Sequence, residues 1–257
     1  MSQAISLLSL IPIRKAPSEQ SEMVSQLLFG ETCVILNEKG SWLEIKTTFD
    51  SYQGWVDKKM VAKIDSNTQI HGEKHIVAKP LVYITNLESG TGQWIVAGSE
   101  VYNLSKDKAV FSILSNSYKI HDFSEPDIKL SKKEQLVNTA LTLINSPYLW
   151  GGRSILGIDC SGLAQITYKV CNIVIPRDTK DQSKLGKSTH INNAQQGDLA
   201  FFSKEGKTVS HVGIIMEDKK IIHASGKVRI DKLDQNGIYN EELKDYTHQL
   251  VSIKKLI

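Results

Sequence analysis

The stretch from Tyr148 to Leu163 constrains this chain more than any other. It reads Tyr-Leu-Trp-Gly-Gly and, a few residues later, Ile-Asp-Cys-Ser-Gly-Leu. After Cys160, apolar residues recur at the spacing of an amphipathic helix, and Asp159 is a favoured N-cap residue. The sequence therefore predicts a helix that begins at Cys160. A helix N-terminus carries partial positive charge, which favours a cysteine thiolate over the thiol.

Composition and charge narrow the class of protein. Hydrophobic residues make up 40% and charged residues 23% of the 257, and the formal net charge is +3. These values are ordinary for a globular protein that buries sizeable cores. The sequence has no dense run of Lys and Arg with interleaved aromatics, and no apolar run has the length of a membrane span. We therefore expect neither nucleic acid nor a membrane as a partner.

The cysteines indicate the compartment. The sequence has three cysteines, Cys33, Cys160 and Cys171, and their spacing shows no pairs. This pattern indicates neither a disulfide framework nor a CxxC metal motif. Free thiols suit a reducing compartment. The apolar residues 5–13 lack a basic segment before them and a small-residue cleavage site after them, so we interpret them as a strand rather than an export signal. We expect a cytoplasmic location.

The first half of the chain has short strand patterns and no long helical periodicity. Residues 42–46 and 54–56 are apolar or aromatic segments separated by a polar turn, and further turns are marked at residues 30–31 and 39–41. Several short strands at close spacing predict a small β-barrel. A second set of strand patterns, which ends near residue 128, predicts a second and more divergent barrel.

The pattern changes near Pro126. Ser131 and Glu134 form a capping-box sequence that leads into apolar residues at helical spacing, and Pro147 follows that helix. After the helix at Cys160 and a polar stretch over residues 177–196 come three predicted strands. Their ranges are residues 198–202, 211–216 and 221–225. Helices followed by an antiparallel sheet are typical of an α+β domain.

Hydrolysis by a cysteine requires a nucleophile, a general base, a group that orients the base, and donors for the oxyanion. Cys160 is the candidate nucleophile. His211 begins one predicted strand and His223 lies in the next, and the short turn between them predicts a hairpin. Both imidazoles share a face only if the hairpin loop has an odd number of residues. We expect His211 to be the base and His223 to orient it, with the Cys160 N–H and the Tyr148 hydroxyl as candidate oxyanion donors.

Other interpretations of these residues stay open. A zinc site is possible on ligand type alone, but the sequence offers no fourth ligand and a cysteine at a helix start suits nucleophilic chemistry better. We expect no metal and no cofactor. Trp150 and the two glycines after it are interpreted as a wall of the substrate cleft rather than only as an anchored turn. Structural roles are expected for His71, His75, His121, His190 and His248.

Together these segments resemble the NlpC/P60 family of papain-like cysteine peptidases. The resemblance covers about residues 131 to 257, and its motifs occur in the family's order. They are Pro-Tyr-Leu-Trp-Gly-Gly at 147–152, Asp-Cys-Ser-Gly at 159–162, Arg-Asp-Thr at 177–179, Gln-Gly-Asp-Leu at 196–199, Ser-His-Val-Gly-Ile at 210–214 and His-Ala-Ser-Gly at 223–226. Any one of these motifs is weak, whereas the set is very specific.

The first half resembles bacterial SH3 (SH3b) domains. The matching segments are Pro-Ile-Arg at 12–14, Gly-Glu at 30–31, Gly-Ser-Trp-Leu-Glu-Ile at 40–45 and Tyr-Gln-Gly-Trp-Val at 52–56. The implied fold is two small SH3-like β-barrels followed by an α+β papain-like domain. The expected domains are residues 1–66, 67–128 and 129–257. This arrangement resembles that of the YkfC-type γ-D-glutamyl-L-diamino-acid endopeptidases, which recycle murein peptides.

The resemblance implies a catalytic set of Cys160, His211 and His223. It also implies a substrate, a cell-wall peptide with a free N-terminal L-Ala, cut between γ-D-Glu and meso-diaminopimelate or Lys. Asp178, which follows an Arg, is expected to bind the L-Ala ammonium. The other residues implied to line the substrate site are Tyr148, Asp159, Ser161 and Thr179. The first SH3b domain is expected to close the cleft and to contribute Glu22 and Tyr52. Glu19 is the alternative to Glu22.

The sequence leaves rival functions. One is an exported hydrolase of intact peptidoglycan whose SH3b domains anchor it to the wall. Another is a non-catalytic protein that binds muropeptides. A third, an amidase or acyltransferase acting on small lipids, shares the Cys/His arrangement but does not account for the SH3b pair or Asp178. The sequence predicts neither the protein partners nor the oligomeric state.

Overall fold

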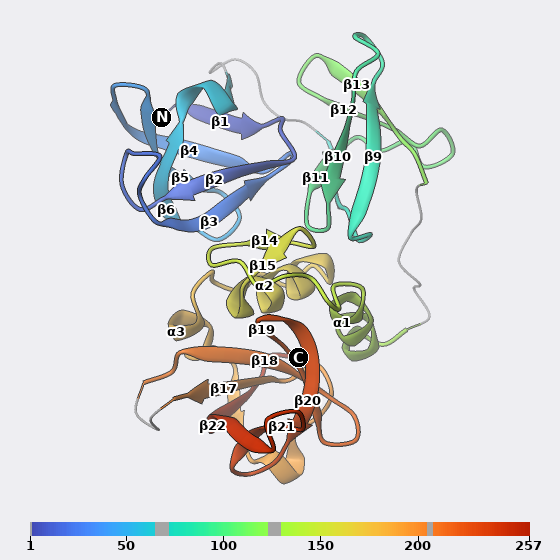
Figure 1. Cartoon of the computed structure of the whole chain (residues 1–257). Helices are drawn as coiled ribbons and strands as arrows, with labels where there is room; N and C mark the ends of the chain where they lie inside the picture. Colours follow the sequence, from blue (N-terminus) through green and yellow to red (C-terminus); the bar gives the residue numbers. More distant parts are fainter. Residues whose placement is uncertain (1, 65–71, 123–129, 205–207) are drawn as a thin grey trace. The chain divides into compact units, whose positions relative to one another are not determined.

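The computed structural model describes residues 2–64, 72–122, 130–204 and 208–257 (Figure 1). The chain divides into two compact units, Met1–Glu125 and Pro126–Ile257. The expected domain boundaries after residues 66 and 128 both lie outside the described residues, as does His71. Within the described ranges, no helix combines the length and the apolar character needed to cross a bilayer.

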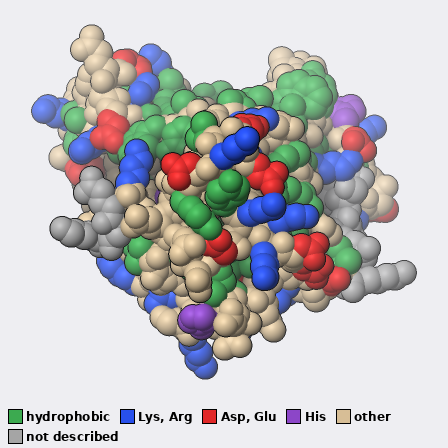
Figure 2. Space-filling view, turned by 60° about the horizontal axis from the view of Figure 1, so that its bottom comes forward, with side chains coloured by type: hydrophobic (Ala, Val, Ile, Leu, Met, Phe, Trp, Pro, Cys, Tyr) green, Lys and Arg blue, Asp and Glu red, His purple; other side chains and the backbone are tan. Residues whose placement is uncertain are grey.

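Charged side chains of both signs are interspersed on the face of the molecule in Figure 2. This distribution agrees with the small formal charge of +3. Proteins that bind nucleic acid instead gather basic side chains on one face. The face in Figure 2 has no such single-sign stripe.

The first unit consists of strands and one short 3-10 helix. Its strands are β1 (Gln3–Ser6), β2 (Leu10–Arg14), β3 (Met23–Leu28), β4 (Thr32–Lys39), β5 (Trp42–Thr47), β6 (Gln53–Asp57), β7 (Val61–Ile64), β8 (Lys74–Ile76), β9 (Leu81–Asn86), β10 (Gly92–Val96), β11 (Glu100–Tyr102), β12 (Val110–Ile113) and β13 (Asn116–Ile120), and its 3-10 helix is η1 (Lys58–Met60). A seven-stranded sheet has the order β3-β2-β6-β5-β4-β1-β7. The later strands form a four-stranded sheet, β10-β9-β13-β12, and the pair β11-β8.

The second unit begins with the two helices that the sequence predicts. Helix α1 (Lys132–Leu141) is capped by Ser131, and the reciprocal bonds of the capping box with Glu134 are both present. Helix α2 (Cys160–Val170) is capped by Asp159, which accepts a hydrogen bond from the Gly162 N–H. Both helix starts are thus confirmed. A third helix, α3 (Thr179–Gln182), lies in the stretch that was expected to be a polar loop.

The sheet of the second unit closes on itself. Its strands are β16 (Lys187–Thr189), β17 (Leu199–Ser203), β18 (His211–Met216), β19 (Lys220–Ser225), β20 (Lys227–Leu233), β21 (Gly237–Asn240) and β22 (Asp245–Lys255). The 3-10 helix η2 (Ile191–Asn193) lies between β16 and β17 in the chain. A separate hairpin consists of β14 (Arg153–Ser154) and β15 (Gly157–Ile158). The order is β16-β22-β17-β18-β19-β20-β21, and β22 also pairs with β21. Strands β17 to β22 therefore form a closed antiparallel barrel, which has no free edge within that ring.

The sequence predicts only three strands for this sheet and misses β16, β20, β21 and β22. The reason is visible in β20, where Asp231 occupies a buried position between charged and apolar neighbours. A carboxylate at an inward position breaks the alternation of apolar and polar residues that identifies a strand in a sequence. The prediction of strands at 198–202, 211–216 and 221–225 is confirmed to within a residue or two.

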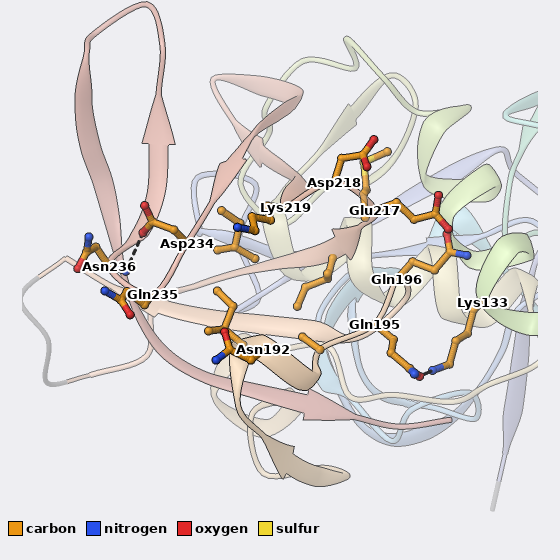
Figure 3. A pocket seen from close by; sticks show the side chains of 15 residues that line it. Lys133, Asn192, Gln195, Gln196, Glu217, Asp218, Lys219, Asp234, Gln235 and Asn236 are labelled. Atoms are coloured by element: carbon orange, nitrogen blue, oxygen red, sulfur yellow. Dashed lines mark hydrogen bonds between the residues drawn. The ribbon is translucent and has the colours of Figure 1, made fainter.

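A groove of about 890 Å³ opens beside the turn between β18 and β19 (Figure 3). Amide side chains line much of it, among them Asn192, Gln195 and Gln196. The Lys133 ammonium donates a hydrogen bond to the Gln195 side-chain oxygen at its rim. The groove lies at the end of β18 that is remote from His211, and none of the predicted site residues lines it.

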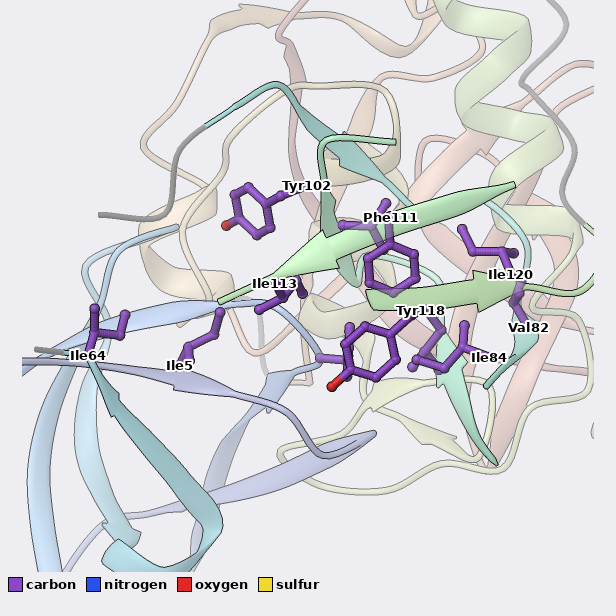
Figure 4. Close-up of a cluster of buried hydrophobic side chains, with 12 residues drawn as sticks. Ile5, Ile64, Val82, Ile84, Tyr102, Phe111, Ile113, Tyr118 and Ile120 are labelled. Carbon is purple, nitrogen blue, oxygen red and sulfur yellow. The ribbon is translucent and has the colours of Figure 1, made fainter. Parts of the chain in front are cut away.

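The two larger sheets of the first unit both contribute to a hydrophobic core (Figure 4). Ile5, Phe29 and Ile64 come from the first 64 residues and pack with buried side chains of β9 to β13. The Phe29 ring meets Phe111 and Tyr118 edge to face, with ring centroids 6.0 and 5.6 Å away. The prediction of a strand-rich first half followed by a domain of helices and an antiparallel sheet is confirmed. The later strands do not form a separate compact unit, so the count of two SH3-like barrels is not confirmed.

Gly30 allows the two parts of this unit to approach. Its φ of +79° lies in the left-handed region, and a Cβ at this position would lie 1.8 Å from the Glu100 carbonyl oxygen. The Glu100 N–H donates to the Phe29 carbonyl across the same contact. Only a residue without a Cβ fits here.

We predict that Phe29→Ala lowers the free energy of unfolding of the first unit by about 3–5 kcal/mol, because it empties a core site shared by two sheets. Urea unfolding followed by tryptophan fluorescence measures the loss, since Trp42, Trp55 and Trp94 all lie in this unit. Leu8→Ala is the control, because Leu8 is 45% exposed. Equal midpoints for the two variants would contradict the shared core.

Candidate active site

Cys160 lies in the first turn of α2, and 7% of its surface is exposed. Its sulfur is 3.8 Å from the Thr179 hydroxyl. The Val212 backbone also hydrogen-bonds to the thiol. Because Val212 follows His211 directly, the start of α2 and the start of β18 meet at the sulfur.

The Asp159 carboxylate organises the residues around Cys160. One oxygen accepts hydrogen bonds from the Gly162 N–H at 2.7 Å and from the Ser161 hydroxyl at 3.2 Å. The other accepts from the Gly151 N–H at 2.8 Å. Arg177 donates to both oxygens, at 2.9 and 2.6 Å, and is itself 1% exposed. The carboxylate thus connects three chain segments, and the expectation that Asp159 also lines the substrate site stays a prediction.

The hairpin prediction for the two histidines is confirmed. In the register of β18 and β19, Gly213 faces His223 and Met216 faces Lys220, which leaves a three-residue loop. The odd loop places His211 and His223 on one face of the hairpin. The His211 Nε2 lies 2.9 Å from the His223 Nδ1, and the two side chains are buried.

A carboxylate that the sequence analysis missed continues this arrangement. The His223 Nε2 lies 2.9 Å from the Asp231 Oδ2. Asp231 belongs to β20, where it also pairs with the Arg229 guanidinium. A signal was available, because Asp231 lies eight residues after His223 in a run with partial alternation, Val228-Arg229-Ile230-Asp231, that could have been recognised as the next strand.

His248 also belongs to this cluster. Its ring stacks on His211 with centroids 4.2 Å apart and an interplanar angle of 26°. Burial lowers the pKa of His248 to about 4, with further lowering by the nearby His223 and Lys204. The sequence analysis assigned His248 a structural role, and the structure places it against the candidate base because β22 closes the barrel.

Burial favours the neutral forms of both candidate reacting groups. It raises the pKa of the Cys160 thiol, and the Asp159 charge adds to this effect. It lowers the pKa of His211 well below 6.5, with His223 and His248 adding to the lowering. The helix N-terminus was expected to favour the thiolate, and desolvation acts in the opposite direction.

Comparison with known proteins identifies the domains. Residues 145–247 match the NlpC/P60 family, and residues 13–60 match the bacterial dipeptidyl-peptidase SH3 domain. The second unit is an NlpC/P60 cysteine peptidase domain. The predicted resemblance to NlpC/P60 peptidases with an N-terminal SH3 domain is thus confirmed.

Two curated relatives match most of the chain. The γ-D-glutamyl-L-lysine dipeptidyl-peptidase of Bacillus cereus is 29% identical over 245 residues, which cover 86% of this chain and 74% of that protein. Dipeptidyl-peptidase 6 of Lysinibacillus sphaericus is 28% identical, with 88% and 90% covered. The crystal structure of an NlpC/P60 family protein from Bacillus cereus shares the fold, with a TM-score of 0.83 over 99% of both chains at 22% identity.

Residues 147–152 of the NlpC/P60 domain pack against β15 and the start of α2. A Cβ at Gly152 would lie 2.3 Å from the Gly157 carbonyl oxygen, so its glycine is needed for packing inside the protein. Trp150 is 61% exposed and Tyr148 is 36% exposed. Burial, with the nearby Cys160 and Asp159, raises the pKa of Tyr148 to about 12, so its phenol stays protonated.

The remaining predicted substrate-binding residues lie in both units. Asp178 is exposed and precedes α3 as its N-cap residue, although its side chain makes no capping bond. In the SH3-bearing unit, Glu22 and Tyr52 directly precede β3 and β6, and β2 pairs antiparallel with both strands. Glu22 and Tyr52 therefore lie at the same end of that sheet. Glu22 pairs with Lys15 at 3.2 Å, and the alternative, Glu19, pairs with Arg14 at 3.6 Å.

Among the described residues, no group of three or more His, Cys, Asp or Glu side chains has the arrangement of a metal site. The facing nitrogens of His211 and His223 instead hydrogen-bond to each other.

We predict that Arg177→Met lowers the free energy of unfolding of the NlpC/P60 domain by about 3–5 kcal/mol, because it leaves the buried Asp159 charge without its cation. Urea unfolding and hydrogen exchange of the α2 amides measure the effect. The control is Lys184→Met, which removes an exposed ion pair with Asp181 and should cost less than about 1 kcal/mol. A loss of the same size in both variants would refute the role of the buried pair.

We also predict that the NlpC/P60 domain loses stability as the pH falls from about 6.5 toward about 4, in part through His248. Its folded pKa lies below its unfolded value, so the unfolded chain takes up a proton that the folded chain excludes. Urea unfolding at pH 7 and pH 5 should show a smaller decline for His248→Gln than for the wild type. The exposed His190→Gln is the control and should decline as the wild type does. Identical declines for His248→Gln and the wild type would disprove the prediction.

Proposed function

We propose that this protein is a cysteine endopeptidase that cuts the bond between γ-D-Glu and the diamino acid in cell-wall peptides with a free N-terminal L-Ala. The observation that carries the proposal is a pair of hydrogen-bonded imidazoles, one of which directly precedes Val212. The Val212 backbone hydrogen-bonds to the thiol of Cys160 at the start of α2. The names of the relatives, which include γ-D-glutamyl-L-lysine dipeptidyl-peptidase, support the substrate class.

Cys160 is the proposed nucleophile. The Nε2 of His211 is occupied by His223, so the proton of the thiol passes to the other ring nitrogen, Nδ1. The sulfur then attacks the γ-carbonyl carbon of D-Glu and forms a tetrahedral oxyanion. The Cys160 N–H is available to the oxyanion because the first N–H groups of a helix have no partner within it. The Tyr148 phenol, which keeps its proton, is the proposed second donor.

Collapse of the oxyanion breaks the amide bond. His211 returns the proton to the leaving amine of the diamino acid, and a thioester remains on Cys160. A water molecule then attacks the thioester with His211 as base, which releases the L-Ala-γ-D-Glu dipeptide and restores the thiol. His223 holds the His211 ring through the 2.9 Å hydrogen bond during both steps.

The free amine of L-Ala is the proposed determinant of specificity. Asp178 is the proposed partner of this ammonium, because it is an exposed carboxylate one residue before Thr179, whose hydroxyl touches the Cys160 sulfur. An acylated L-Ala, as in the intact glycan-linked stem, would lose this ion pair. The reaction therefore belongs after a step that releases the peptide from its acyl linkage. Since all three cysteines are free thiols, we propose the cytoplasm as the location.

Purified protein incubated with L-Ala-γ-D-Glu-diaminopimelate, its L-Lys analogue and the N-acetylated forms tests the proposal. We expect release of the diamino acid from the free-amine peptides, at least tenfold lower kcat/KM for the acetylated forms, and no release by Cys160→Ala. Equal rates for acetylated and free peptides would favour a hydrolase of intact peptidoglycan. No turnover by the wild type would favour a binding protein.

We predict that Asp178→Asn lowers kcat/KM for the free-amine peptide by tenfold or more and removes most of the preference over the acetylated form, because an ion pair with the substrate is worth about 1–3 kcal/mol here. Asp181→Asn is the matched control, since it removes a nearby exposed carboxylate of α3. In the same assay, the substitutions Glu22→Gln and Tyr52→Phe test whether these two residues line the substrate site, as the sequence predicts. A preference that survives in Asp178→Asn would rule out this assignment.

A further inference from the structure

Asp231 is a buried carboxylate with a fixed set of partners. It is 7% exposed, its Oδ2 lies 2.9 Å from the His223 Nε2, and its Oδ1 accepts from the Arg229 Nη2 at 2.9 Å. The Arg229 Nε also lies close to the carboxylate, 2.8 Å from Oδ2. Burial raises the pKa of Asp231, but the hydrogen bonds with His223 and Arg229 outweigh burial and lower it below 3.8. The carboxylate is therefore ionised at neutral pH and can only accept hydrogen bonds.

This acceptor determines where protons lie on the neighbouring rings. In the neutral form of His223 the single N–H lies on Nε2, where it donates to Asp231. Its Nδ1 is then an acceptor, so the hydrogen bond between the rings requires a proton on the His211 Nε2. By the same argument the His211 Nδ1 has a lone pair, and a lone pair at this nitrogen is what a general base for Cys160 requires.

We propose that Asp231 is a positioning residue that sets the tautomers of both His223 and His211 and so keeps the base nitrogen of His211 unprotonated. The inference rests on the proposed function for its consequence in catalysis, whereas the tautomers themselves do not depend on the substrate. Arg229 holds the carboxylate in place from the far side.

The groups that face this relay come from four strands and one helix. They are His211 on β18, His223 on β19, Asp231 and Arg229 on β20, His248 on β22 and Cys160 on α2. Asp231 is the carboxylate among these groups, and it bonds to an imidazole nitrogen of His223. An amide in its place could donate as well as accept, which would allow the reversed order of protons along both rings. In that order the His211 Nδ1 carries the proton and cannot act as a base.

The test compares Asp231→Asn with the wild type. We expect kcat for the free-amine peptide to fall between 10²- and 10⁴-fold, because exchange of Asp for Asn beside a catalytic imidazole has lowered kcat about 10⁴-fold in serine proteases by favouring the wrong tautomer. KM should change less than threefold, since Asp231 does not touch the substrate. Glu242→Gln is the control, because Glu242 contacts Arg229 at 3.4 Å and is largely exposed, and it should keep wild-type kcat.

A second measurement reads the tautomers without any substrate. Nitrogen NMR of the full chain with labelled histidines should show Nε2 protonated in both His211 and His223 of the wild type. In Asp231→Asn a measurable fraction should carry the proton on Nδ1. Wild-type rings with Nδ1 protonated would overturn the inference, even if the variant does not fold.

The two proposals fail separately. If the wild type shows the expected tautomers but hydrolyses none of the peptides, the proposed function is wrong and the positioning role stands. If the wild type hydrolyses the peptide and Asp231→Asn keeps its kcat, the positioning role is wrong and the proposed function stands.

Discussion

The Asp159 carboxylate connects the start of α2 to two other segments of the NlpC/P60 domain. It caps the helix through the Gly162 N–H, binds the Gly151 N–H of the preceding loop, and forms a two-pronged ion pair with Arg177. A buried carboxylate is tolerated only when its charge and lone pairs are matched, and here each oxygen has several donors. Because Cys160 follows directly, the same bonds hold the position of the sulfur.

The closed barrel supplies the other half of the site. His211 and His223 come from neighbouring strands, Asp231 from the next one, and His248 from the strand that closes the ring. Their side chains form a continuous line of ring contacts and hydrogen bonds. A hydrogen-bonded line of this kind restricts which protons can move, because each bonded ring nitrogen acts either as donor or as acceptor. Burial lowers the pKa of His211 and of His248, which favours their neutral forms.

The unit that contains the SH3 domain depends on a different kind of constraint. One of its hydrophobic cores joins side chains from its two larger sheets, and the contact at Gly30 and Glu100 leaves no room for a Cβ. Close packing between sheets therefore makes residues 2–122 one compact unit over the part that the structure describes. The strand patterns of the sequence suggested two barrels because they record which residues alternate along a strand, but not which sheets share a core.

The sequence by itself determined the elements that depend on neighbouring residues. The capping box at Ser131, the cap at Asp159 and the hairpin between His211 and His223 are all set within a few positions, so local patterns revealed them. That the hairpin loop has an odd number of residues came only from the register of β18 and β19. The tertiary structure alone decided the partners of these elements. Asp231, Arg229 and Arg177 are charged, and in a sequence a charged residue looks solvated. Asp231 and Arg177 become buried, and Arg229 half-buried, because strand pairing and helix packing bring them to His223 and Asp159, whose contacts offset the cost of removing each charge from water.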